Sequence, residues 1–72
     1  MVEIFQTNLT NGRAAQKLLE QLSHLFPEYR MNFDLEDCDN ILRVESVKHS
    51  VEVIPIIEAV QGYGHYIAVL PD

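Results

Sequence analysis

The chain has 72 residues, which is enough for one domain, residues 1–72, with an apolar content of 47% that is typical of a globular protein. Five Lys and Arg side chains against eleven Asp and Glu give a net charge of −6, which disfavours nucleic acid and anionic membranes as partners. The only cysteine is Cys38, so no disulfide can form within the chain.

We expect a cytoplasmic protein. Every apolar run is too short to span a membrane, and Met1-Val2-Glu3 lacks the basic start and apolar segment of a signal peptide. A lone thiol also fits a reducing compartment better than an oxidising one. No membrane partner is expected.

The first half of the chain predicts a strand, a helix and a second strand. Residues 2–7 are rich in strand-forming side chains, and residues 8–12 form a turn cluster. A helix is expected from about Asn11, capped by Thr10 or Asn11 itself, to the residue before Pro27. Its apolar stripe recurs every three or four residues: Ala15, Leu18, Leu19, Leu22, Leu25 and Phe26.

The second strand comprises residues 29–35, which alternate between apolar and polar side chains. An acidic turn follows, and residues 41–47 complete a hairpin and begin a second half with the same order of strand, helix and strand. A helix is expected from Ser50 or nearer Val53, since Pro55 suits only a first turn, to Gln61 with Gly62 as its stop. Residues 63–70 are the last strand.

Two strand-helix-strand halves predict an α+β, ferredoxin-like two-layer sandwich. Right-handed connections give a four-stranded antiparallel sheet with both helices on one face. In this arrangement we expect Leu19 and Leu22 of the first helix to face the sheet, opposite Phe33 and Val44.

The chain resembles the heavy-metal-associated domain family, which includes small copper chaperones. The resemblance covers nearly all residues and rests on the element order and on four segments: Asn8-Leu9-Thr10, Phe33-Asp34-Leu35, Ile41-Leu42-Arg43-Val44 and Gly62-Tyr63. The family motif is Met-Thr-Cys-x-x-Cys. The equivalent residues here are 9–14, with Asn11 and Ala14 at the two cysteine positions.

The missing cysteines remove the chemistry that the resemblance would imply. Cu(I) and Zn(II) bind best to thiolates, whereas Asn11 is a poor ligand, Ala14 is none, and Arg13 adds a cation beside the site. We therefore expect no metal and no cofactor, and a non-catalytic binding or interaction module. Two alternatives stay open: a metal-binding protein with other ligands, and a small ferredoxin-like enzyme such as an acylphosphatase or a dimeric monooxygenase.

Other candidate sites are weak. Cys38 lies between Asp37 and Asp39, which disfavour its thiolate. Residues 34–45 partly match the spacing of an EF-hand loop, but Asp39 stands where the sharp turn needs glycine. The three histidines lie on three different elements and form no close metal-binding set: His24, His49 and His65.

The sheet face away from the helices is the candidate interaction surface. If Val2 and Ile4 point inward, then Glu3, Phe5 and Thr7 point outward. If Tyr63 also points inward, the outward residues of the last strand are Tyr66, Ala68 and Leu70. We expect Phe5 and Tyr66 to form an aromatic pair that binds a protein partner or mediates weak homo-oligomers. The charge of −6 opposes self-association unless Arg30 and Arg43 offset it locally.

Overall fold

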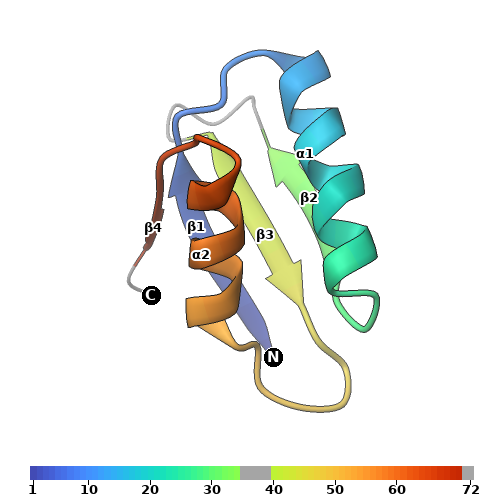
Figure 1. Ribbon diagram of the computed structural model, residues 1–72. Helices are drawn as coiled ribbons and strands as arrows, with labels where there is room; N and C mark the ends of the chain where they lie inside the picture. Colours follow the sequence, from blue (N-terminus) through green and yellow to red (C-terminus); the bar gives the residue numbers. More distant parts are fainter. Residues whose placement is uncertain (35–39, 71–72) are drawn as a thin grey trace.

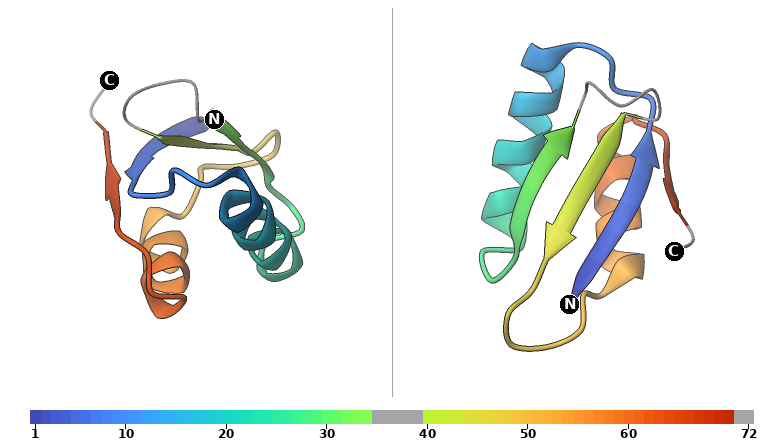
Figure 2. Two further views of the ribbon diagram at one scale, coloured as in Figure 1. Left: turned by 90° about the horizontal axis from the view of Figure 1, so that it is seen from above. Right: turned by 180° about the vertical axis from the view of Figure 1, so that it is seen from behind.

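The structure is a computed structural model that describes residues 1–34 and 40–70. Four strands form one sheet, and two helices pack on one of its faces (Figures 1 and 2), which confirms the predicted ferredoxin-like two-layer sandwich. In chain order the elements are β1 (Val2–Thr7), α1 (Gly12–Leu25), β2 (Arg30–Asp34), β3 (Ile41–Glu45), α2 (Val53–Gly62) and β4 (Ile67–Val69). Among the described residues, no helix has the length and apolar character needed to cross a bilayer.

The sheet has the strand order β2-β3-β1-β4, and all its neighbours are antiparallel. β1 and β3 therefore occupy the centre, while β2 and the three-residue β4 form the edges. The hairpin expected between the second and third strands is present, with Asp34 opposite Ile41. Its turn, residues 35–39, lies outside the described residues.

Helix α1 begins where its capping residue predicts. The Asn11 side chain accepts hydrogen bonds from the backbone N–H groups of Arg13 (2.8 Å) and Ala14 (3.3 Å). Leu18 and Leu22 are fully buried, whereas Leu19 is only partly buried at the margin of the core. The helix is thus rotated slightly from the expected orientation.

The end of α2 differs from the prediction. Gly62 is the last helical residue rather than the stop, and Gly64 has the positive φ of 88°. The N–H of His65 donates to the carbonyl of Val60 and that of Gly64 donates to Gln61, which is a Schellman motif. Tyr63 precedes Gly64 and is 41% exposed, so the expectation that it points inward is wrong.

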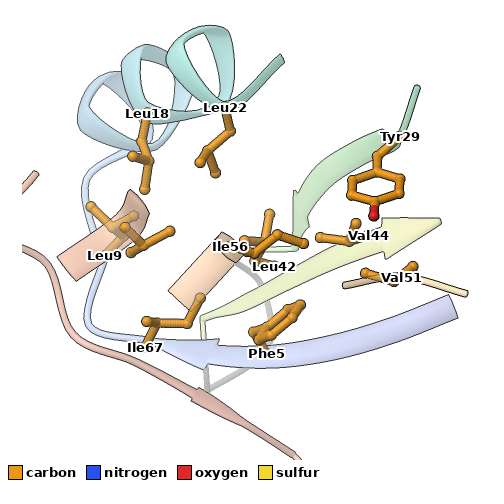
Figure 3. Close-up of a cluster of buried hydrophobic side chains, with 11 residues drawn as sticks. Phe5, Leu9, Leu18, Leu22, Tyr29, Leu42, Val44, Val51, Ile56 and Ile67 are labelled. Carbon is orange, nitrogen blue, oxygen red and sulfur yellow. The ribbon is translucent and has the colours of Figure 1, made fainter. Parts of the chain in front are cut away.

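The side chains of β1 alternate in the opposite phase to the prediction. Phe5 is fully buried and lies directly opposite Leu42, which is also fully buried. Figure 3 shows both side chains pointing with Ile56 into the space between sheet and helices. Thr7 is buried on the same face, and Glu3 lies opposite the buried Val44. Glu3, Phe5 and Thr7 therefore face the helices.

Candidate functional site

The face of the sheet away from the helices, here called the open face, is the leading candidate site. In the view from behind, Figure 2 shows that α1 and α2 both lie on the other side of the sheet. Since residues opposite each other on antiparallel strands share a face, the register assigns its members. They alternate with the core residues along each strand: Val2, Ile4 and Gln6 on β1, Ile41, Arg43 and Glu45 on β3, Arg30, Asn32 and Asp34 on β2, and Ala68 on β4.

The half of the open face along β1 and β4 is mostly apolar. Val2 is 46% exposed, Ile4 and Ala68 are partly buried, and the N–H of Leu70 donates to the carbonyl of Ile4 at 2.9 Å. This bond continues the β1–β4 pairing by one residue and places Leu70 beside Ile4. We call these four residues, Val2, Ile4, Ala68 and Leu70, the apolar stripe.

Tyr66 extends the apolar stripe at one end. It lies two residues before Ala68, its N–H donates to the Asn8 side chain at 3.1 Å, and its side chain is 54% exposed. Strand alternation therefore carries its ring to the open face. Ile41 of β3 lies opposite Gln6 on this face and is not part of the core cluster between sheet and helices, but it is buried, so it adds no exposed apolar surface.

The half of the open face along β2 and β3 is polar and charged. Arg30 lies opposite Glu45, Arg43 lies opposite Asn32 on one side and Ile4 on the other, and Asp34 lies opposite Ile41. Both arginines are exposed. The strands thus present two positive and two negative side chains on this face, so the formal charge of its described strand positions is zero.

The expected interaction surface is partly corrected by these positions. The register places Ala68 on the open face, and Tyr66 and Leu70 lie two residues to either side of it, whereas Phe5 lies in the core, so there is no Phe5–Tyr66 pair. Ile4 takes the place that was expected for Phe5. Sequence reasoning missed Ile4 because Val2-Glu3-Ile4 reads most simply with the charged residue outward, and one misplaced residue reverses the whole strand.

The turn before α1 holds the two positions that correspond to the cysteines of the resembling family. Asn11 is exposed, and its side-chain oxygen is occupied by capping the helix. Ala14 is one turn further along α1 and partly buried. In residues 1–34 and 40–70, no three His, Cys, Asp or Glu side chains lie together as a metal site would require. Cys38 and most of the acidic turn considered for calcium lie outside these residues.

A groove of about 330 Å³ between α1 and the α2–β4 turn is a second candidate site. Its lining combines an apolar floor with hydrogen-bonding side chains: Ala14, Lys17, Leu18, Gln21, Tyr63 and His65. The amine, carboxamide and imidazole could hold polar atoms of a small molecule. The sequence spacing of Ala14, Lys17, Leu18 and Gln21 shows that they share one side of α1, but it does not reveal their proximity to His65.

The other two histidines lie away from this groove. His24 is exposed in the last turn of α1, where a positive charge would be favourable for the helix dipole. His49 precedes α2, with its ring edge-on to Tyr29 and its Nδ1 2.9 Å from the carbonyl oxygen of Ser50. Only His24 therefore lies on an element: His49 is in the loop between β3 and α2, and His65 is in the turn before β4 rather than in the expected last strand.

Comparisons with known proteins give no relative for this chain. It matches no protein-family model, no curated protein and no solved structure. The resemblance to the heavy-metal-associated domains is therefore still a prediction from the sequence, and the open face and the groove must be judged on their own chemistry.

Proposed function

We propose that this chain is a non-catalytic interaction module: a relative of the heavy-metal-associated domains that lacks their cysteine pair and binds protein through its open face. The observation that supports this most directly is the apolar stripe, Val2, Ile4, Ala68 and Leu70, on a sheet face that no helix covers. Contiguous apolar surface of this kind is typical of contact sites.

Tyr66 gives the proposed surface an anchor. Its aromatic ring is more than half exposed at the end of the apolar stripe, and tyrosine is one of the residues that most often dominate binding energy at protein interfaces. Arg43 lies beside Ile4 of the stripe and Arg30 lies on the edge strand β2; both are exposed and would supply the polar rim that such interfaces have.

A site-specific photo-crosslinker in the host cell tests this function. Placed at Tyr66 it should yield a defined cross-linked protein, and Ile4→Ser should reduce that yield. Tyr63 provides the matched control, since it is also an exposed tyrosine but lies at the end of α2. Equal cross-linking from positions 66 and 63, or none from position 66, would contradict the proposal.

The groove favours a second candidate function, the binding of a small molecule or of a metal through non-cysteine ligands. His65 offers an imidazole there, and Lys17 and Gln21 offer hydrogen-bond donors. Titration with Zn²⁺, followed by NMR of the backbone amides of Lys17 and Gln21, tests the metal version. A saturable shift that His65→Ala abolishes and His24→Ala retains would support it.

A further inference from the structure

We propose that the partner on the open face is a second copy of this chain, with the two sheets packed face to face about a twofold axis. This inference rests on the proposed function and names its partner. It follows from where the charges of the molecule lie relative to the apolar stripe.

Self-association of this chain faces a general electrostatic penalty. Each copy carries a net charge of −6, so two copies repel each other. The charged open-face positions of the strands contain two of the five basic side chains but only two of the eleven acidic ones. All of the excess negative charge therefore belongs to residues outside these positions.

The charges at the described strand positions of the open face therefore balance, so these positions give no net repulsion between two copies. At physiological ionic strength, interactions between exposed charges are largely screened beyond about 8 Å, so the local balance matters more than the total. A strongly basic partner would gain no net attraction from these strand positions, because their positive and negative charges balance. The charge distribution consequently favours a like partner here.

The layout of the open face also suits a twofold pairing. In a symmetric dimer the same patch contacts itself, so it must be self-complementary. The apolar stripe can pack on the apolar stripe of the partner, with sheets about 10 Å apart, as in other face-to-face sheet packings. Arg43 lies beside Ile4, and Glu45 is two residues further along β3, so each copy presents both charge signs next to the apolar contact. Either sign can then meet its opposite across the interface.

Sedimentation equilibrium measures this association directly. Between about 10 µM and about 1 mM, the full chain should pass from monomer to dimer, and Ile4→Ser should raise the dimer dissociation constant about tenfold or more. Ile54→Ser is the matched control: it makes the same change at an isoleucine of α2 that is 62% exposed in the helix layer, and it should leave association unchanged. Val2→Ser, at the exposed start of β1, repeats the test if Ile4→Ser fails to fold.

Reversing the charge at position 43 or 45 tests whether opposite charges pair across the proposed dimer interface. Arg43→Glu gives the open face two surplus negative charges, and Glu45→Lys gives it two surplus positive charges. Each variant alone should be more monomeric than the original chain, because like-charged faces repel. An equimolar mixture should restore the dimer as a heterodimer. Failure of the mixture to associate more strongly than either variant alone would overturn the proposed charge pairing.

The failure of this inference is distinguishable from the failure of the proposed function. A chain that stays monomeric up to about 1 mM, or equal weakening by Ile4→Ser and Ile54→Ser, would overturn the second copy as the partner. The photo-crosslinker at Tyr66 would still trap a different protein if the open face binds one. If the chain stays monomeric and the crosslinker at position 66 traps no protein, the open face is not an interaction surface.

Discussion

Phe5 of β1 lies directly opposite Leu42 of β3, and neither side chain has any exposed surface. This pair fixes which residues of the two central strands face the helices. Ile4, one residue earlier, is therefore committed to the open face together with Arg43. The position of a single aromatic ring thus decides where the candidate interaction site lies.

The first prediction contrasts these two neighbouring residues. Phe5→Ser should lower the free energy of unfolding by about 3–5 kcal/mol or abolish folding, because it removes a buried ring and introduces a hydroxyl into the core. Ile4→Ser should cost clearly less, since that side chain is only partly buried. Urea denaturation monitored by circular dichroism measures both. An equal loss of unfolding free energy in the two variants would show that Phe5 does not face the helices with Ile4 on the opposite side.

The second prediction concerns the facing of α1. Leu22→Ala should reduce the free energy of unfolding by about 2–5 kcal/mol, because Leu22 is fully buried against the core. Leu19→Ala should cost less, since Leu19 lies at the margin of the same core. The unfolding midpoints and slopes of the two variants give the comparison. A larger loss for Leu19→Ala would mean that the helix is rotated toward the orientation first expected from the sequence.

The third prediction separates two glycines by backbone conformation alone. An added Cβ would meet no atom within 4 Å at either Gly64 or Gly12, but only Gly64 has a positive φ. Gly64→Ala should therefore cost about 1 kcal/mol or more through strain, whereas Gly12→Ala, in the first turn of α1, should be neutral or stabilising. Thermal denaturation of both variants checks this. A loss of stability for Gly12→Ala as large as that for Gly64→Ala would contradict it.

The fourth prediction concerns metal. Without thiolates at positions 11 and 14, the chain should not bind Cu(I) or Zn(II) with submicromolar affinity in competition with a chelator. The double variant Asn11→Cys with Ala14→Cys, made in a Cys38→Ser background, should create such binding if the turn has the shape of the resembling family.

The control for this experiment is Asn11→Ser with Ala14→Ser in the same background. Serine retains a capping oxygen for α1 at position 11 but supplies no thiolate. Tight binding by the serine control would assign the metal to other ligands. Absence of binding by the cysteine variant, with the fold intact by circular dichroism, would show that this turn has diverged from the family in shape as well as in ligands.

The helices and strands that depend on interactions between neighbouring residues could be predicted from the sequence. The apolar stripe of α1, its Asn11 cap and the alternation in residues 29–35 predicted the order of elements and hence the two-layer sandwich. Helix periodicity, capping and strand alternation are properties of neighbouring residues, so they can be recognised in a single chain. The start of α2 at Val53 likewise followed from the restriction that Pro55 imposes on a helix.

The facing of β1 required the tertiary structure. Alternation has a period of two, so Val2-Glu3-Ile4-Phe5 allows two opposite assignments, and only the pairing with Leu42 and Val69 selects one. The groove likewise brings together His65 of the α2–β4 turn and Lys17 of α1, which are far apart in the sequence. The sequence by itself therefore determined which elements form and how they connect, while the tertiary structure decided which side chains share the open face, because cross-strand partners are set by packing between residues far apart in the chain.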